Sequence, residues 1–354
     1  MGSIIFVANR YVSNLMLGSN ATPPHAASHI CVPTAVNHTP EFNAINHERQ
    51  VVKPALEQTH LPTPVVINEL SRYLTGYTHE LFNELLVGFS FGFRLLCLKP
   101  PVSGIARNHP SALDHPIQIE EFISNGLRLG RLAGPFESPP FDKFFFSPLG
   151  FVPKAELCKY RIIQDLSYPR GASVNSGIPH DVSQVSYDTI DDVVRLILKN
   201  GPRALMSKTD IEDAFRIIPI HPDDYHLLEF SGDGRFFYDR CLPMGASRSC
   251  NIFESFSKAL VWILRNKFNV RDVSHILDDF FFVGPNDSND CHNALSQFVY
   301  LCDKIGVPIK VSKTVTPTNV ITIYGIEVDR VMMECRLPLP KIEKTVTKIT
   351  EFFN

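Results

Sequence analysis

The chain has 354 residues, and its hydrophobic fraction of 44% is enough to build a sizeable folded core. A formal net charge of -3 excludes a strong overall attraction to nucleic acid, so binding of that kind must depend on local basic patches. The 8 cysteines form no C-x-x-C pair and no histidine spacing typical of zinc, and the sequence has neither a secretion signal nor an apolar run of membrane-spanning length. We therefore expect free thiols and an intracellular protein, in the cytoplasm or nucleus, that is neither secreted nor bound to a membrane.

The first part of the chain divides into two predicted regions. Residues 1–62 mix Pro, His, Asn and Thr without sustained periodicity, which is typical of a poorly ordered leader, and we assign them no function. Residues 66–96 place apolar side chains at helical spacing, interrupted by glycines, and residues 117–132 have the pattern of an amphipathic helix. Residues 63–135 are therefore predicted to form a helical accessory region.

From residue 136 onward the sequence alternates strand and helix patterns, after a Pro-rich boundary, GPFESPPFDKFFFSPLGFVPK. Strand character is found in RIIQDLS, ALMSKTDI, RFFYDRCL, SHIL, FFFVG and ITIYGIEVD, and helical spacing in DTIDDVVRLILKN, SCNIFESFSKALVWILRNKF and DCHNALSQFVYLCDKIG. This order predicts an α+β fold with helices packed on a largely antiparallel sheet. The last segment, LPLPKIEKTVTKITEFFN, has the pattern of a helix that stops after its first turns, which suggests that a further domain has been lost or never existed.

Two adjacent aspartates stand between apolar runs in SHILDDFFFVG. A strand, a tight turn and a returning strand would place Asp278 and Asp279 at the tip of a hairpin. A second strand, ALMSKTDIEDAF, runs into Asp210 and continues through Asp213, so that a third carboxylate stands at a strand end. Each residue also has an ordinary interpretation, because Asp is a common turn residue, Asp210 could cap the following segment and Asp213 could be solvated.

A cluster of three carboxylates suits one class of chemistry in particular. Phosphoryl transfer to a sugar hydroxyl uses two divalent cations roughly 4 Å apart, one beside the attacking oxygen and one beside the leaving pyrophosphate. Mg2+ prefers a few carboxylate oxygens together with phosphate and water, and clustered carboxylates repel one another unless a cation is bound. Asp210, Asp278 and Asp279 are therefore candidate ligands for two Mg2+ ions, with Mn2+ as an alternative.

The order of the motifs resembles that of reverse transcriptases. The segments are SPLGFVPKAELCKYRIIQDLSYPRGASVN, KTDIEDAFR, LPMGASRSCNIFESF, LDDF, and then a lysine and a YGIEVD strand. Within this family the resemblance is greatest to the polymerases of DIRS/Ngaro-type retrotransposons, the tyrosine-recombinase elements, which share the RLGRLAGPFESPPF lead-in and a helical stretch similar to LFNELLVGFSFGFRL. The resemblance extends over most of the chain.

This resemblance implies a right-hand polymerase fold for residues 136–354. The fingers would comprise about 136–185 and 218–246, the palm about 186–217 and 247–337, and the start of a thumb 338–354, with the thumb largely absent. The implied reaction is that of an RNA-directed DNA polymerase, a nucleotidyltransferase that adds deoxynucleotides to a primer 3′-end. Its partners would be an RNA or DNA template, a primer and deoxynucleoside triphosphates, with ribonuclease H and recombinase as further domains encoded by the element.

The resemblance also assigns roles at the metal site. Asp210, with the backbone carbonyl of Ile211 beside it, resembles the first metal ligand, and Asp278 with Asp279 resembles the paired aspartates of the family's Y-x-D-D motif. Ile276 stands where the family usually has an aromatic residue. Lys313 resembles the lysine proposed to protonate the departing pyrophosphate, although a solvated lysine is the simpler interpretation of this loose motif.

Further positions resemble the family's nucleotide-binding residues. Lys154 and Arg161 stand where the fingers grip the incoming triphosphate, and their cationic groups suit phosphate. The backbone amides of Asp213 and Ala214 would hold the same phosphates. Phe215 stands where the family keeps an aromatic steric gate that clashes with a ribose 2′-hydroxyl, although ordinary core packing explains an aromatic residue equally well.

Two residues of LPMGASRSCNIFESF complete the implied nucleotide site. Met244 stands where the family has a residue that touches the nucleotide, commonly Gln, and Gly245 where a glycine lets the backbone approach the base pair.

Two other functions stay open at this point. One is a catalytically inactive, truncated element fragment that at most binds nucleic acid, in keeping with the missing thumb. The other is an RNA-dependent RNA polymerase, which shares the palm and its aspartates but is disfavoured by Phe215.

Overall fold

The computed structural model describes residues 5–6, 60–153 and 160–353. Its centre is a four-stranded antiparallel sheet, here called the central sheet, with the strand order β10-β11-β7-β12. The strands are β10 (Val273–Ile276), β11 (Asp279–Gly284), β7 (Leu205–Asp210) and β12 (Val315–Thr318). Alternate residues of β11 enter two different core clusters, one on each side of the sheet. Burial on both faces explains why this strand is a continuous apolar run.

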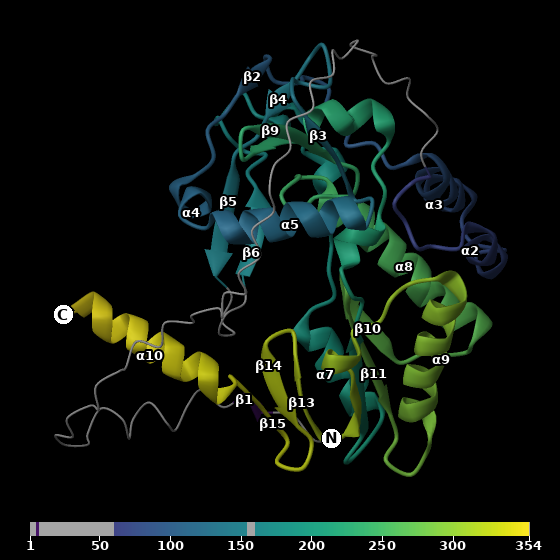
Figure 1. Cartoon of the computed structure of the whole chain (residues 1–354). Helices are drawn as coiled ribbons and strands as arrows, with labels where there is room; N and C mark the ends of the chain where they lie inside the picture. The colour runs from purple at the N-terminus through teal and green to yellow at the C-terminus, as the bar shows by residue number, and fades with distance from the viewer. Residues whose placement is uncertain (1–4, 7–59, 154–159, 354) are drawn as a thin grey trace, which may run out of the picture.

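Three long helices pack against the central sheet (Figure 1): α7 (Ile190–Lys199), α8 (Ser249–Lys267) and α9 (Asp290–Ile305). α7 begins with a capping box, in which the side chains of Thr189 and Asp192 each accept a hydrogen bond from the other's backbone N–H. α9 packs through Phe298, whose ring centroid lies 4.3 Å from that of Phe280 on β11. All three helices lie where their sequence spacing predicts them.

A second sheet, here called the upper sheet, lies at the top of the view in Figure 1. Its strand order is β2-β4-β8-β9-β3, formed by β2 (Gly104–Ile105), β4 (Phe145–Phe146), β8 (Glu229–Gly232), β9 (Arg235–Asp239) and β3 (Leu132–Phe136). The amphipathic helix α5 (Pro116–Arg128) packs its buried face on this sheet, where Ile119 and Ile123 join Phe230 and Phe237 in one apolar cluster. A separate hairpin pairs β5 (Leu149–Pro153) with β6 (Tyr160–Gln164), near the short helices α4 (Pro110–Leu113) and α6 (Val174–Gly177).

The predicted helix pattern over residues 66–96 is divided in two by a turn. α2 (Ile67–Tyr73) packs against α9, and α3 (His79–Phe91) packs against α8. The rings of Phe89 and Phe256 lie 5.0 Å apart at the second of these contacts. Residues 63–135 thus contain the expected helices, and they also contribute β2 and most of β3 to the upper sheet. Sequence spacing could not indicate these strands because they are short and irregular.

The C-terminal part forms a third sheet, in the order β1-β15-β14-β13. It comprises β1 (Ile5–Phe6), β15 (Glu334–Arg336), β14 (Ile326–Asp329) and β13 (Val320–Ile323). The segment ITIYGIEVD, which we expected to be one strand, is instead a hairpin, because Tyr324 and Gly325 have φ values of 48° and 79° and reverse the chain. α10 (Leu339–Phe353) follows the expected helical pattern, and none of its described residues is buried.

The remaining described elements are the 3-10 helices η1 (Asp181–Ser183), η2 (Ala214–Ile217), η3 (Pro222–Leu227) and η4 (Val311–Lys313). No helix in the described part of the chain is long and apolar enough to cross a membrane. The predicted leader, residues 1–62, lies outside the described residues except for 5–6 and 60–62.

Candidate active site

The central sheet brings the three predicted aspartates to one of its ends. Asp279, the first residue of β11, is the direct partner of Asp210, the last residue of β7. Asp278 lies in the two-residue turn between β10 and β11, and its carbonyl oxygen accepts a hydrogen bond of 3.1 Å from the amide of Ile211. Two strands that are far apart in sequence therefore place their carboxylates side by side.

Burial and mutual repulsion disturb the ionisation of this group. Burial, and then repulsion from the neighbouring Asp210, raise the pKa of Asp278 to about 6. The pKa of Asp279 is also raised, again chiefly by burial and then by Asp210. The Lys313 ammonium lies 2.6 Å from the Asp210 carboxylate, a side chain that is only 6% exposed. Burial lowers the pKa of Lys313, but the contact with Asp210 outweighs this effect and the pKa is raised.

These residues have the chemistry of a divalent-cation site. Carboxylate oxygens are the ligands that Mg2+ and Mn2+ accept, and the raised pKa values of Asp278 and Asp279 reflect burial first and repulsion from Asp210 second. Within the described residues, no three His, Cys, Asp or Glu side chains are already gathered as a preformed metal site. Lys313 provides the positive charge beside Asp210 instead. The donor set thus fits a cation, and a cation bound to Asp210 would compete with this lysine.

The turn that carries Asp278 is held by buried polar side chains of α8. Leu277 has a φ of 53°, a left-handed conformation that is unfavourable for a branched side chain. Glu254 accepts a hydrogen bond of 3.2 Å from the Leu277 amide, and the Ser257 hydroxyl donates one of 2.8 Å to the Leu277 carbonyl. His275 Nε2 also lies 3.1 Å from Glu254 Oε1. Sequence reasoning missed these residues; the only available signal was two polar positions within the buried stripe of α8.

A second set of contacts ties the β13–β14 hairpin to the central sheet. The Ser274 hydroxyl donates to Asp188 at 2.8 Å and lies 2.9 Å from the Tyr324 hydroxyl at the hairpin turn. Lys208, on β7, donates to the backbone carbonyl of Thr322 at 2.6 Å. The β13–β14 hairpin is therefore fixed relative to the strands that bear the aspartates.

The loop after Asp210 contains three of the predicted nucleotide-binding residues. Asp213 adopts a left-handed conformation, with φ 51° and ψ 34°, and its carboxylate pairs with Arg131 at 2.8 Å. Ala214 and Phe215 begin η2 and are both buried. The Phe215 ring is only 7% exposed and stacks on Phe253, with 5.2 Å between centroids. This burial agrees with the packing role, and the gate role stays a prediction.

Three of the other nucleotide-binding predictions lie in the described part of the chain. Arg161 is exposed on β6, opposite Val152 of β5. Lys154 lies outside the described residues. Met244 is 55% exposed. A Cβ at Gly245 would lie 2.6 Å from the carbonyl oxygen of Gln164, so glycine is required there by the close approach of β6.

Asn175 is a site-adjacent residue that sequence reasoning missed. Its side-chain amide donates to the Gly245 carbonyl at 2.9 Å and accepts from the Ser247 amide at 2.8 Å. It also donates to the Ser167 hydroxyl at 2.9 Å. Asn175 therefore fixes the loop of Gly245 relative to the segment that follows β6.

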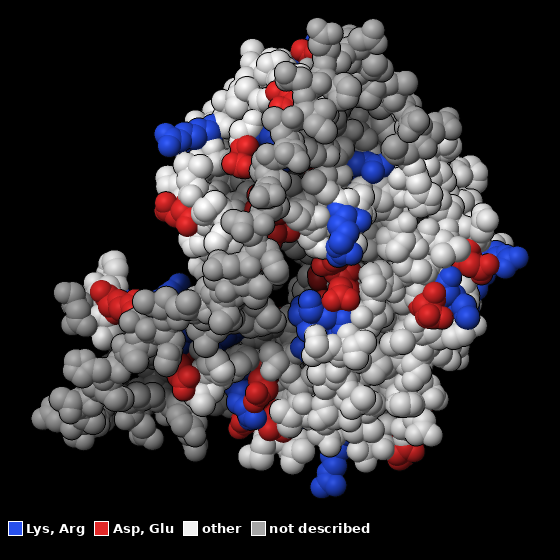
Figure 2. All heavy atoms as spheres, in the orientation of Figure 1, with Lys and Arg blue, Asp and Glu red and all other residues white. Residues whose placement is uncertain are grey.

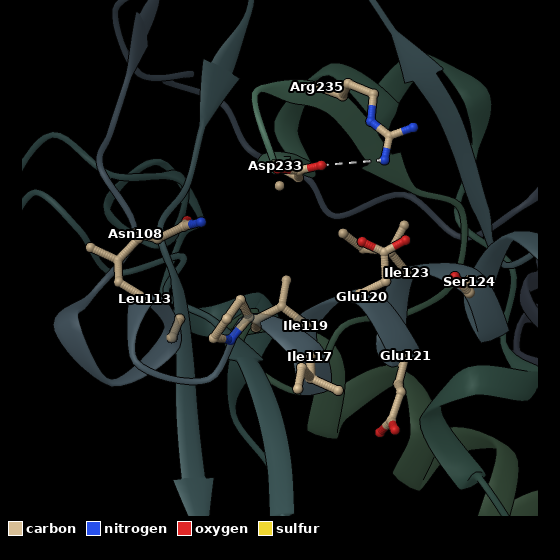
Figure 3. A pocket seen from close by; sticks show the side chains of 13 residues that line it. Asn108, Leu113, Ile117, Ile119, Glu120, Glu121, Ile123, Ser124, Asp233 and Arg235 are labelled. Carbon is tan, nitrogen blue, oxygen red and sulfur yellow. Dashed lines mark ion pairs between the residues drawn. The ribbon is translucent and has the colours of Figure 1, made fainter. Parts of the chain in front are cut away.

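The surface around the site combines both signs of charge. Figure 2 shows acidic side chains in a hollow near the middle of this face, with basic side chains above and below them. A separate cavity of about 630 Å³ lies between α5 and the β8–β9 turn (Figure 3). Its lining includes Ile117 and Glu120 of α5, together with Asp233 and Arg235, and it contains none of the predicted site residues. The candidate active site is thus distinct from this cavity.

Part of the chain matches a known protein family. A family model described as "Reverse transcriptase (RNA-dependent DNA polymerase)" matches residues 156–328, a range that includes all three aspartates. Protein P of duck hepatitis B virus (United States strain) is 30% identical over 141 residues, which are 39% of this chain and 16% of that protein. Protein P of the China strain is 29% identical over 142 residues, 39% of this chain and 18% of that protein. The match therefore spans less than a fifth of these relatives.

Solved structures share the fold. A foamy viral protease-reverse transcriptase in complex with double-stranded DNA aligns with a TM-score of 0.53 and 16% identity, over 80% of this chain and 48% of that chain. The same kind of protein in complex with an RNA/DNA hybrid aligns with a TM-score of 0.53 and 16% identity, over 82% of this chain and 38% of that chain. The predicted α+β polymerase fold is thereby confirmed. Residues 156–328 are therefore similar to the reverse transcriptase domain of RNA-directed DNA polymerases.

Proposed function

We propose that this chain adds deoxynucleotides to the 3′-end of a primer, directed by an RNA or DNA template, by two-metal phosphoryl transfer. The observation that carries the proposal is the pairing of Asp279 with Asp210 on adjacent strands, with Asp278 in the turn between β10 and β11. Mg2+ is the proposed ion and Mn2+ the alternative. When bound, the two ions supply activation of the primer hydroxyl and neutralisation of the leaving pyrophosphate.

The chain's own residues would hold and orient the reactants. Asp210, Asp278 and Asp279 bind the ions, assisted by the backbone carbonyl of Ile211. Lys313, which already contacts Asp210, is placed to offset charge or deliver a proton to the pyrophosphate. We assign metal binding to the carboxylates because they lie at the end of the central sheet. We assign the proton-delivery role to Lys313 because it lies on the neighbouring η4.

Residues of β6, of the start of η2 and of the loop of Gly245 would bind the incoming nucleotide. Arg161 on β6, with Lys154 near it in sequence, is proposed to grip the triphosphate, and the amides of Asp213 and Ala214 to hold the same phosphates. Met244 and Gly245 would face the nucleotide and the base pair. Base pairing would supply sequence specificity, so the protein should contact backbone and shape.

Phe215 is proposed to select deoxynucleotides. Its stacking on Phe253 fixes the ring beside the loop of Asp210, which is what a rigid steric gate requires. A ring held by the core cannot move aside for a ribose 2′-hydroxyl without disturbing that core.

We also propose that the chain comes from a DIRS/Ngaro-type retrotransposon. The RLGRLAGPFESPPF segment supports this origin; it covers the end of α5 and β3. Ribonuclease H and tyrosine-recombinase motifs encoded beside this chain in the genome are the expected observation, and a viral gene order around it would contradict the origin.

Primer extension with Mg2+ or Mn2+ tests the activity. The wild-type chain should extend a primer, Asp278→Asn should abolish extension, and Asp303→Asn, an exposed aspartate on α9, should leave it intact. Absence of extension by the wild-type chain with either ion would favour the inactive fragment that at most binds nucleic acid. Preference for ribonucleotides would favour an RNA-dependent RNA polymerase.

A further inference from the structure

An ion pair links the upper sheet to the loop that follows the first catalytic aspartate. The Arg131 guanidinium lies 2.8 Å from the Asp213 carboxylate, although the two residues are far apart in sequence. Arg131 directly precedes β3 and its side chain is only 20% exposed, whereas Asp213 is 52% exposed. The arginine is thus the partly buried, fixed member of the pair. Nothing in the motif order assigned it a role.

The loop that Arg131 contacts has an unusual backbone. Asp213 is left-handed, with φ 51° and ψ 34°, a conformation that residues other than glycine adopt at a cost and that Asp tolerates better than most. Its carbonyl accepts a hydrogen bond of 2.6 Å from the Arg216 amide, which starts η2. Among the described residues, no backbone or side-chain oxygen accepts a hydrogen bond of normal geometry from the amides of Asp213 and Ala214. The two amides therefore have no acceptor among the described residues.

Further contacts connect the same loop to β3 and β9. Arg216 forms a bidentate pair with Asp239 of β9, one of whose contacts is 2.9 Å. Asp239 in turn is the strand partner of Leu132, the residue after Arg131, and the Arg131 carbonyl accepts from the Arg240 amide at 2.9 Å. The loop is thus fixed to β3 through Arg131 and to β9 through Arg216. Such bidentate, partly buried arginine pairs constrain geometry more than exposed lysine pairs do.

The negative charge of Asp213 would affect the binding of a triphosphate at this loop. A triphosphate held by the amides of Asp213 and Ala214 would come close to the Asp213 carboxylate, and like charges at that range repel. Arg131 neutralises that carboxylate and draws it toward β3. We propose that Arg131 is a positioning residue for the incoming nucleotide: it holds the loop of Asp213 in its left-handed conformation and cancels the carboxylate charge beside the triphosphate. This inference rests on the proposed nucleotidyl transfer.

A double-variant experiment distinguishes this role from a structural one. In single-nucleotide incorporation, Arg131→Met should raise the KM for deoxynucleotide about fivefold, with a smaller change in kcat, because the carboxylate is left uncompensated. Adding Asp213→Asn should recover most of the lost affinity. The matched control is Arg128→Met, whose guanidinium contacts Asn125 on the exposed face of α5 and which should leave the KM unchanged. A double variant no better than Arg131→Met would overturn the charge role.

A second measurement does not depend on catalysis. Hydrogen exchange of the η2 amides, residues 214–217, should be faster in Arg131→Met than in the wild type and in Arg128→Met. Unchanged exchange would overturn the positioning role even in an active enzyme. A wild-type chain that incorporates no nucleotide would instead reject the proposed function, while faster exchange in Arg131→Met would still support the attachment of the loop to β3.

Discussion

Lys313 and Asp210 form an ion pair of 2.6 Å in which the lysine is half-exposed and the aspartate is buried. The positive charge of Lys313 is therefore already next to the Asp210 carboxylate, which is a proposed metal ligand. The same lysine lowers the pKa values of Asp278 and Asp279, which burial and mutual repulsion raise. Several measurable properties of the site depend on this one contact.

Removing Lys313 should make the site depend more strongly on metal. In Lys313→Met, a divalent ion no longer competes with the ammonium, so the Mg2+ or Mn2+ concentration that raises Tm should fall about fivefold, equivalent to roughly 1 kcal/mol for a partly exposed pair. The measurement is thermal unfolding over a metal titration. Lys304→Met, on the surface of α9, is the control and should titrate like the wild type. An unchanged titration in Lys313→Met would show that metal and lysine do not share Asp210.

The buried Glu229 should make stability depend on pH. Burial raises the pKa of Glu229 from 4.5 to about 8, and only the Phe145 amide opposes the shift. The pKa of Glu229 is higher in the folded state than in the unfolded state. The contribution of Glu229 to the free energy of unfolding is therefore complete below pH 4.5 and is lost as the pH rises through 8. Glu229→Gln should therefore be more stable than the wild type above pH 8, by about 1–3 kcal/mol for an avoided buried charge.

Urea unfolding between pH 5 and 9 measures this dependence. Glu80→Gln, an exposed residue of α3, provides the control and should keep the wild-type profile. Parallel profiles for Glu229→Gln and the wild type would mean that Glu229 does not titrate in this range.

The Ser257 hydroxyl should matter to catalysis because it holds the turn that carries Asp278. Ser257→Ala leaves the Leu277 carbonyl without this donor, which should cost about 1 kcal/mol of stability and lower kcat more than it changes the KM for deoxynucleotide. Ser255→Ala is a matched control on the same helix, since the Ser255 hydroxyl donates to the Asn251 carbonyl one turn earlier. Equal kcat values for the two variants would argue against a role of α8 in placing Asp278.

Substitutions of Phe215 and Phe253 distinguish a role of Phe215 in sugar selection from a role in core packing. Phe215→Val should lower the free energy of unfolding by about 2–3 kcal/mol and increase incorporation of ribonucleotides relative to deoxynucleotides. Phe253→Val removes the ring that fixes Phe215, with a similar loss of stability, and should weaken sugar selection less than Phe215→Val does. Competition between the two nucleotide types on one primer measures the ratio. An identical ratio in both variants would assign Phe215 to packing alone.

Some of this organisation was predictable because it is local. The helices α7, α8 and α9 follow from periodic apolar side chains, and the hairpin with Asp278 and Asp279 at its tip follows from two apolar runs around a short turn. The order of the motifs along the chain resembles that of reverse transcriptases. Errors occurred where short turns interrupt a strand pattern, as at Tyr324, and where strands have only two residues, as in β2.

The sequence by itself determined which segments bear carboxylates and that these segments end in turns, because strand and helix periodicity is set by neighbouring residues. Only the tertiary structure decided that Asp210 faces Asp279, that Lys313 reaches Asp210 and that Arg131 holds Asp213. Each of these contacts joins residues separated by tens of positions, and their register depends on how two independently formed elements pack. The physical reason is that local spacing limits the conformation of one element but carries no information about its partner.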